Sequence, residues 1–235
     1  MKLLPSKARK FFERKTADLN YKSAVGGHWD DVGKLQFEYL QKLGLQPHHK
    51  LLDLPCGSLR VGRFLVDYLN DHCYYGTEGN PNLIKAGLSD VLPAEKVDVV
   101  NLKHVMLGDE SVNFQQLFKT HFDFIWVHAL FDHIPHQIII QFLKDITSVM
   151  NESTQLYATI FLNPHGENFK EPIIHPRYNS IKDGVITFSD KEYWHHTIEF
   201  FEIATREIPS LQLDQCLYDY PHPLGLRVLK FSKQS

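Results

Sequence analysis

The sequence lacks several features that would assign it to a class at once. It has only 3 cysteines, spaced far apart, so we expect neither a disulfide framework nor a Cys-x-x-Cys zinc motif. Apolar runs all fall short of the ~18 residues of a membrane span, so we expect no stable membrane insertion. The formal net charge of −3 offers no bulk positive charge to a nucleic acid, which we do not expect as a partner. These absences favour a cytoplasmic protein.

The composition is otherwise that of an ordinary globular protein. Of the 235 residues, 43% are hydrophobic and 23% are charged. Basic residues crowd the start of the chain, so residues 1–24 are interpreted as a basic N-terminal arm. The remainder, residues 25–235, has the length of a single domain. A monomer or a homodimer is compatible with these numbers.

Apolar periodicity predicts alternating helices and strands along the chain. A capping-box pattern, Ser189 to Glu192, predicts the start of the last helix. For the third strand the sequence offers two alternative ranges, 97–102 and 105–107, and does not decide between them. The alternation, followed by a terminal hairpin, predicts the α/β class: a doubly wound, Rossmann-like seven-stranded sheet with an antiparallel C-terminal edge strand. The expected helices are 29–43, 60–69, 80–87, 138–150 and 189–205, and the other expected strands are 50–54, 73–77, 122–127, 156–162, 211–218 and 226–231.

Two of these strands end in residues suited to holding a nucleoside. The first strand runs into Asp53, Pro55, Cys56 and Gly57, a tight turn that opens a helix. The second strand ends on Glu78, 21 positions after Gly57. In a parallel sheet, the turn after the first strand admits the ligand and a carboxylate after the second takes the ribose hydroxyls.

These segments resemble the glycine-rich first motif and the acidic second motif of class I S-adenosylmethionine-dependent methyltransferases. The stretch Pro55-Cys56-Gly57-Ser58-Leu59-Arg60-Val61-Gly62 resembles a first motif of the form Gly-Cys-Gly-Ser-Leu-Arg-Gly-Gly, common in one bacterial group of that family. Against the usual first motif of the family, Asp-x-Gly-x-Gly-x-Gly, Pro55 and Leu59 stand at glycine positions. The segments 25–38, 122–135 and 220–225 extend the resemblance over residues 25–232. It implies S-adenosylmethionine as cofactor and S-adenosylhomocysteine as product.

The resemblance also implies which residues contact the cofactor. Glu78 would accept hydrogen bonds from the ribose, and Asp109, after the third strand, would lie near adenine N6. Asp53 would order the turn and lie near the amino group of the cofactor, and a cap on the following turn is the alternative role. The positions that the motifs assign to the cofactor are Asp53, Pro55, Cys56, Gly57, Glu78, Gly79, Asp109 and His128.

A polar cluster follows the fourth predicted strand, where cofactor and acceptor would meet. Transfer to a hydroxyl requires removal of its proton, and histidine has a suitable pKa. His133 is our first choice for this base and Asp132 the second, although His133 is as readily read as a histidine packed at a helix start. His128 and His136 lie close by in sequence, but the spacing matches no helical metal-ligand pair, so we expect no metal.

The connection 163–188 is long for a compact domain and rich in histidine, proline, tyrosine and asparagine. Long connections of this kind tend to be lids or binding loops. We interpret it as a lid over the acceptor, a plain surface loop being the alternative. The residues expected to bind the substrate are His165, Arg177, Tyr178 and His222.

Together these patterns predict methyl transfer to a small molecule or glycan, at an oxygen atom. One alternative is an enzyme that binds S-adenosylmethionine but catalyses a non-methylating step. A second alternative is a degenerate partner subunit that keeps the fold without activity.

Overall fold

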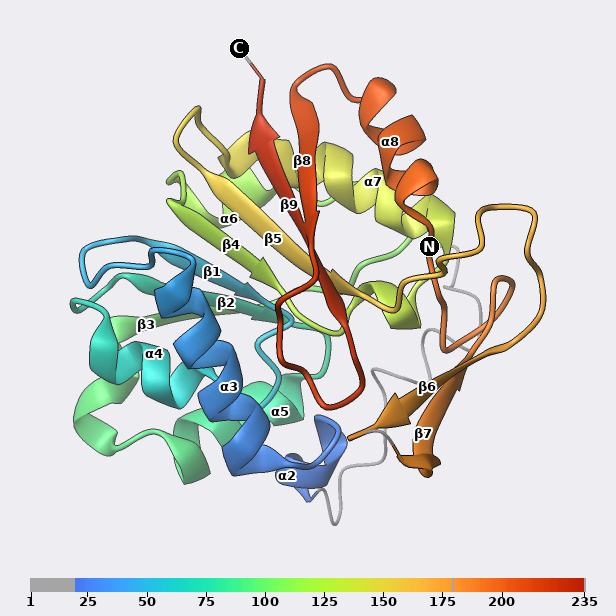
Figure 1. The fold of residues 1–235 in the computed structure, drawn as a ribbon. Helices are drawn as coiled ribbons and strands as arrows, with labels where there is room; N and C mark the ends of the chain where they lie inside the picture. Colours follow the sequence, from blue (N-terminus) through green and yellow to red (C-terminus); the bar gives the residue numbers. More distant parts are fainter. Residues whose placement is uncertain (1–19, 179, 235) are drawn as a thin grey trace. The chain divides into compact units, whose positions relative to one another are not determined.

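The computed structural model describes residues 20–178 and 180–234 (Figure 1), so most of the predicted basic arm, residues 1–19, lies outside the described residues. Seven strands form one sheet in the order β3-β2-β1-β4-β5-β9-β8, and β6 and β7 form a separate two-stranded sheet. The strands are β1 Leu51–Leu54, β2 Tyr74–Glu78, β3 Val100–His104, β4 Phe124–Val127, β5 Gln155–Ile160, β6 Ile173–Arg177, β7 Ser180–Thr187, β8 Leu211–Leu217 and β9 Arg227–Lys233.

The pairing confirms the predicted fold class. Strand β2 pairs in parallel with both β1 and β3. Strand β9 runs antiparallel to β5, and β8 pairs antiparallel with β9 at the edge. The helices are α2 Tyr21–Ala24, α3 Trp29–Lys42, α4 Gly62–Tyr68, α5 Pro81–Ala86, α6 Phe114–Phe118, α7 His136–Ile146 and α8 Ile198–Arg206.

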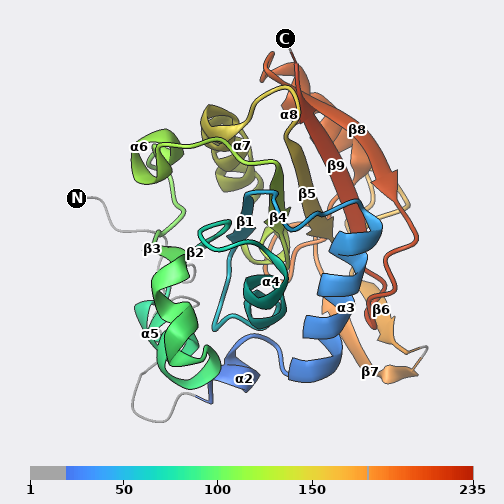
Figure 2. The ribbon, with the colours of Figure 1, turned by 90° about the vertical axis from the view of Figure 1, so that its left-hand side faces the viewer.

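The chain divides into two compact parts. The first part comprises the described residues up to Gly108 together with Phe122–Trp126, and the second comprises Asp109–His121 and the described residues from Val127 onward. In the first part, α3 lies beside α4 (Figure 2), where Phe37 stacks on Phe64 at a ring separation of 5.8 Å. Gly33 permits this approach, because a Cβ there would lie 2.6 Å from the backbone oxygen of Arg60.

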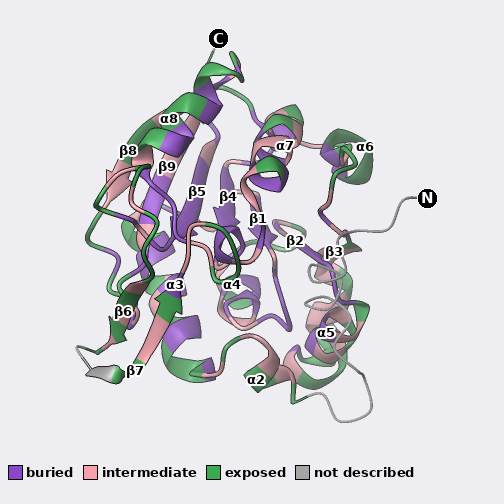
Figure 3. Cartoon of the chain, turned by 90° about the vertical axis from the view of Figure 1, so that its right-hand side faces the viewer, coloured by how far each residue is buried: buried purple, intermediate pink, exposed green. Residues whose placement is uncertain are grey.

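The core of the second part is built around aromatic residues. The ring of Phe131 lies 5.8 Å from Phe142 in α7 and 5.6 Å from Phe201 in α8. All but the first residue of β5 is buried, whereas β6 alternates between half-buried and exposed residues (Figure 3). In β7, Lys182, Asp183 and Ile186 are exposed and only Thr187 at its end is buried among the residues whose burial is described. The long connection 163–188 therefore contains a two-stranded hairpin of its own.

The structure corrects one sequence expectation and decides between two alternatives for the third strand. The helix predicted for 189–205 begins only at Ile198, because the side chain of Thr197, and not that of Ser189, caps it by accepting from the Phe200 N–H at 3.1 Å. The third strand is 100–104, which overlaps only the first of the two candidate ranges. Over the residues described, no helix combines the length and apolarity needed to cross a bilayer.

Candidate functional site

The turn after β1 is built around Gly57. Its φ of +57° is a left-handed conformation that side chains rarely adopt. A Cβ on Gly57 would lie 2.7 Å from Cγ1 of Val25, so a glycine is required on both grounds. The Gly57 N–H donates to Oε2 of Glu78 at 3.0 Å, which joins the turn after β1 to the end of β2.

Glu78 is held in place by the backbone on both sides. Its second oxygen, Oε1, accepts from the Asn80 N–H at 2.8 Å, and the residue is only 5% exposed. Burial raises the pKa of Glu78 to about 7, although the backbone N–H groups of Asn80 and Gly57 act in the opposite direction. A carboxylate has about four acceptor positions, so an oriented Glu78 retains lone pairs for a ligand.

The other first-motif residues shape the turn. The Tyr74 hydroxyl donates to Oδ2 of Asp53 at 2.7 Å, and burial raises the pKa of Asp53 to about 7. The Cys56 N–H donates to the Thr77 carbonyl at 2.8 Å, while burial raises the pKa of its thiol well above the usual value. Pro55 follows Leu54 through a cis peptide bond.

The departure from the glycine motif at Leu59 has a packing explanation. Leu59 adopts a φ of +67° and is fully buried. A Cβ on Gly62 would meet its side chain at 2.9 Å, and a Cβ on Gly87 would meet it at 2.8 Å. The Leu59 side chain therefore fills the space left by two glycines on neighbouring helices, which compensates for its strained backbone.

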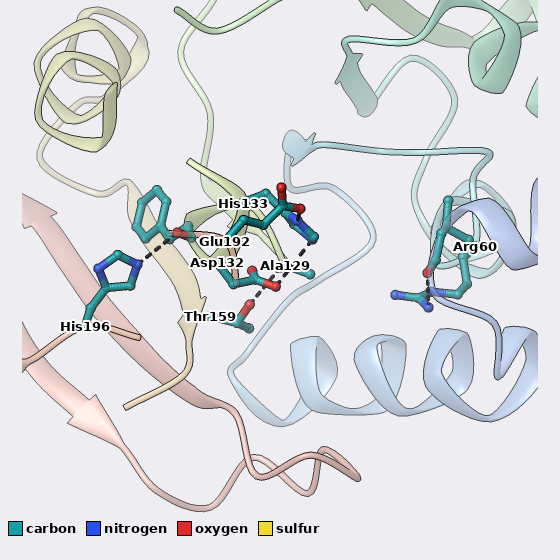
Figure 4. Close-up of polar contacts among 9 residues, drawn as sticks. Arg60, Ala129, Asp132, His133, Thr159, Glu192 and His196 are labelled. Carbon is teal, nitrogen blue, oxygen red and sulfur yellow. Dashed lines mark hydrogen bonds and ion pairs between the residues drawn. The ribbon is translucent and has the colours of Figure 1, made fainter. Parts of the chain in front are cut away.

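Residues 20–27 cover this turn and are bonded to it. The Ser58 hydroxyl donates to the Tyr21 carbonyl at 3.0 Å. The Arg60 guanidinium, drawn in Figure 4, donates to the carbonyls of Val25 at 2.7 Å and Gly27 at 3.2 Å. Two side chains of the first motif thus hold the cover segment against Gly57.

These observations fit a nucleoside cofactor of the type implied by the resemblance. Glu78 would hold the ribose hydroxyls, and the left-handed turn at Gly57 would allow backbone to approach the ligand closely. Gly79, the neighbour of Glu78, is buried, and its carbonyl lies 3.0 Å from Nε2 of His104. Asp109 is exposed.

A second group of polar residues follows β4. His128 is buried, with its Nε2 3.0 Å from the Tyr220 hydroxyl and its ring 5.6 Å from that of His222. The structure thus brings together two residues, His128 and His222, to which the sequence assigned different ligands. Ala129 adopts a φ of +52°, and its N–H donates to the buried Thr159 hydroxyl at 2.8 Å. Strain of this kind is frequent at functional sites.

The predicted catalytic residues lie in the short turn Phe131–His133. Nε2 of His133 is 3.4 Å from Oδ2 of Asp132, and its Nδ1 is 2.7 Å from Oε1 of Glu192 (Figure 4). Sequence analysis assigned Glu192 to a helix cap and therefore missed its contact with His133.

Other histidines of the second part pair with one another. The Thr187 hydroxyl lies 3.0 Å from both His175 Nε2 and His195 Nδ1. His196 Nε2 donates to the Phe131 carbonyl at 2.9 Å, and its Nδ1 lies 3.1 Å from His136 Nε2. Burial lowers the pKa of His175 to about 4 and that of His196 to about 3, so both stay neutral at physiological pH.

The expected substrate residues lie on separate segments. Arg177 donates through Nε to the Asp183 carbonyl at 3.1 Å, across the β6–β7 hairpin. Tyr178 is 63% exposed, and its N–H donates to the Pro223 carbonyl at 2.9 Å, next to His222. His165 is exposed, with its ring 4.5 Å from that of Phe169. Within 20–178 and 180–234, no three His, Cys, Asp or Glu side chains form a group able to hold a metal ion.

Solved structures with similar folds include methyltransferases and complexes with S-adenosylhomocysteine. DhpI in complex with S-adenosylhomocysteine (SAH) has a TM-score of 0.61 at 14% identity, covering 97% of this chain and 95% of that chain. The CcbJ methyltransferase from Streptomyces caelestis has a TM-score of 0.59 at 11% identity, covering 89% and 98%. Magnesium protoporphyrin IX methyltransferase (ChlM) from Synechocystis PCC 6803 with bound SAH has a TM-score of 0.56 at 10% identity, covering 97% and 93%.

No family model matches the sequence. The structural similarity, at identities of 10–14%, establishes the fold. The chain therefore has the Rossmann-like α/β fold of S-adenosylmethionine-dependent methyltransferases, with the seven-stranded sheet predicted from the sequence.

Proposed function

We propose that the chain is an S-adenosylmethionine-dependent methyltransferase that acts on a small molecule or glycan, at a hydroxyl oxygen. The observation that carries the proposal is the bond between the Gly57 N–H and Glu78, which positions a buried carboxylate at the end of β2. The fold similarity to methyltransferases supports the same assignment. When bound, S-adenosylmethionine supplies a methyl group on a sulfonium, which is electrophilic and leaves a neutral thioether.

The residues of the first part would bind and orient the cofactor. Glu78 accepts hydrogen bonds from the ribose hydroxyls, and Gly57 leaves room for the ligand to approach the backbone. The cover segment 20–27, held by Arg60, closes over the turn. From the second part of the chain, the resemblance adds Asp109 and His128 to the proposed cofactor contacts. Because the leaving thioether needs no acid, alignment of the reactants is the main catalytic contribution.

Residues of the second part would serve the acceptor. We assign substrate binding to His165, Arg177, Tyr178 and His222, with the hairpin in 163–188 as the lid. The exposed tyrosine offers a ring for stacking, and the arginine a partner for an acidic group. The net charge of −3 favours acceptors other than nucleic acid. A cytoplasmic monomer or homodimer, with the basic N-terminal arm 1–24 and the single domain 25–235, is part of the same proposal.

Calorimetric titration with S-adenosylmethionine, and separately with SAH, tests the cofactor site. We expect micromolar binding by the wild-type protein and a loss of at least tenfold in Glu78→Ala, since a hydrogen bond to a charged group contributes about 1.5–3 kcal/mol. Glu95→Ala, at an exposed glutamate of the first part, is the matched control and should bind normally.

The outcomes separate the three readings of the sequence. Absence of binding by well-folded wild-type protein would overturn the proposal and favour a degenerate partner subunit. Binding with turnover that releases a product other than SAH would favour a non-methylating reaction. Release of SAH in the presence of a hydroxylated acceptor would support methyl transfer.

A further inference from the structure

Three ionisable side chains form a line within the second part of the chain. Glu192 contacts Nδ1 of His133 at 2.7 Å, and Nε2 on the other side of the ring faces Asp132 at 3.4 Å (Figure 4). The side chains of Asp132 and His133 are 7% and 11% exposed, whereas that of Glu192 is 38% exposed. The line therefore runs from a buried carboxylate to a carboxylate in contact with solvent.

The segment 188–197 holds Glu192 against this ring. Its Trp194 N–H donates to the Asp132 carbonyl at 2.8 Å, and its Phe188 N–H donates to the Tyr193 carbonyl at 2.7 Å. The Tyr193 ring lies 5.0 Å from the His133 ring, edge to face. Backbone bonds on both sides of Glu192 thus limit where its carboxylate can lie.

Asp132 has an unused acceptor. Its Oδ1 atom is buried and has no hydrogen-bond partner. A buried unpaired oxygen of this kind costs free energy that a bound donor would recover. Burial raises the pKa of Asp132, the nearby His133 lowers it, and the charge of Glu192 raises it. Asp132 therefore combines a buried, unpaired acceptor oxygen with a raised pKa.

The arrangement leaves His133 poorly placed to act as the base itself. Both of its ring nitrogens face carboxylates, Glu192 on one side and Asp132 on the other. A hydroxyl of the acceptor would have to displace one of them to reach a nitrogen. Oδ1 of Asp132 has no protein hydrogen-bond partner to displace, and the acceptor reaches this buried atom once the side chains that cover it move aside.

We propose that Asp132 is the catalytic base for a hydroxyl acceptor and that Glu192 is a positioning residue, which orients His133 to receive the proton from Asp132. This inference rests on the proposed methyl transfer. The acceptor proton moves to Oδ1 of Asp132, while the oxygen electron pair forms the new bond to the methyl carbon. The bond between that carbon and sulfur breaks, and its electron pair remains on sulfur. The Asp132 carboxyl group then turns so that its protonated oxygen faces Nε2 of His133. His133, which starts neutral with its proton on Nδ1, takes this proton and becomes an imidazolium between two carboxylates, and the proton leaves to solvent by way of the exposed Glu192.

The variants for the test follow from the charged and titratable groups that surround His133. Asp132 lies on the same turn as His133, and Glu192 and Tyr193 come from the segment 188–197. Glu192→Gln removes the charge but retains an oxygen for the His133 Nδ1–H. Asp190→Asn removes the charge of an exposed residue on the same segment and is the matched control.

The experiment uses NMR on the ligand-free protein. The carboxyl ¹³C resonance of Asp132 is followed against pH, and the ring nitrogens of His133 are followed by ¹H–¹⁵N correlation. In the wild-type protein we expect Asp132 to titrate above the range of ordinary aspartates and the His133 Nδ1 to carry a proton. Glu192→Gln should lower the Asp132 midpoint and move the Nδ1–H resonance upfield, whereas Asp190→Asn should change neither.

Binding of SAH, measured on the same samples, separates this inference from the proposed function. Normal SAH binding together with an Asp132 midpoint that Glu192→Gln leaves unchanged would overturn the inference alone. Absence of SAH binding by the wild-type protein would overturn the proposed function, and the role of Asp132 with it.

With a hydroxyl acceptor that the wild-type protein methylates, Asp132→Asn should reduce kcat by roughly 10²–10⁴-fold while SAH affinity is retained. A wild-type kcat in Asp132→Asn would exclude Asp132 as the base.

Discussion

Val25 lies directly against Gly57, so that its Cγ1 would be 2.7 Å from a Cβ at that glycine. The contact joins the cover segment 20–27 to the turn after β1. Because Gly57 also has a φ of +57°, any side chain there meets both backbone strain and a clash.

Gly57→Ala should therefore destabilise the protein by roughly 2–4 kcal/mol, the sum of a left-handed alanine and an overpacked contact. Gly225→Ala is the matched control, because Gly225 has a φ of +68° with no atom within 4 Å of a Cβ. Urea unfolding should show a larger loss for Gly57→Ala than for the control. Adding Val25→Ala should recover part of the difference, and equal losses at the two glycines would contradict the contact.

Asp53 and Glu78 should make stability depend on pH. Burial raises the pKa of each to about 7, so between pH ~4 and ~7 the folded protein binds more protons at these groups than the unfolded chain. Their contribution to the free energy of unfolding therefore falls as pH rises through this window. His175 and His196 act in the opposite direction in an overlapping range, because their pKa values are lowered to about 4 and about 3.

Comparing the pH dependence of the unfolding free energy between a variant and the wild type isolates the contribution of one carboxyl group. Asp53→Asn should flatten the decline by up to about 1.4 kcal/mol for each pH unit within the window. The measurement is urea unfolding at several pH values. Asp67→Asn, at an exposed aspartate, should leave the slope as it is. A slope that Asp53→Asn does not change would show that Asp53 does not titrate differently in the folded state.

Arg60 should hold the cover segment closed. Its guanidinium donates to the carbonyls of Val25 and Gly27, and a hydrogen bond from a charged group contributes about 1.5–3 kcal/mol. In Arg60→Ala, we expect the Gly26 and Gly27 amides to exchange with deuterium roughly tenfold to a hundredfold faster, by the same free energies. Amides of β2 should keep their protection. The control is Lys34→Ala, which removes an exposed ion pair with Glu38. Unchanged exchange at both glycines would show that other contacts close the segment.

The N-terminus of α8 provides a direct test of the revised helix boundary. Thr197 caps the helix through the Phe200 N–H, so Thr197→Ala should cost about 1 kcal/mol or more in unfolding free energy. Ser189→Ala should cost less than about 0.5 kcal/mol, the range of surface substitutions away from special features. A larger loss of unfolding free energy for Ser189→Ala than for Thr197→Ala in chemical denaturation would instead support a helix capped at Ser189.

Much of the fold was predictable because it depends on local patterns. The sequence placed α3 and β4 within two residues of their observed limits, since α3 has a regular apolar face and the buried strand β4 is a continuous apolar run. The place of Glu78 at the end of β2 followed from the apolar run that precedes it and from its spacing to Gly57. The error at Ser189 has a local origin too: a capping pattern is compatible with a helix but does not require one, and backbone pairing of Phe188 with Tyr193 and His195 overrides it.

The sequence by itself determined the seven-stranded α/β class, the succession of the strands of that sheet and two candidate carboxylates, Glu78 for the cofactor and Asp132 as a base. Only the tertiary structure decided the partners of these groups. Glu192 meets His133 across 59 positions of the chain, and Tyr220 meets His128 across 92. No periodicity encodes such contacts, because they depend on where separate loops are carried by the strands and helices that flank them. The tertiary structure also decides which side chains are buried, and burial raises the pKa of Glu78 and of Asp132.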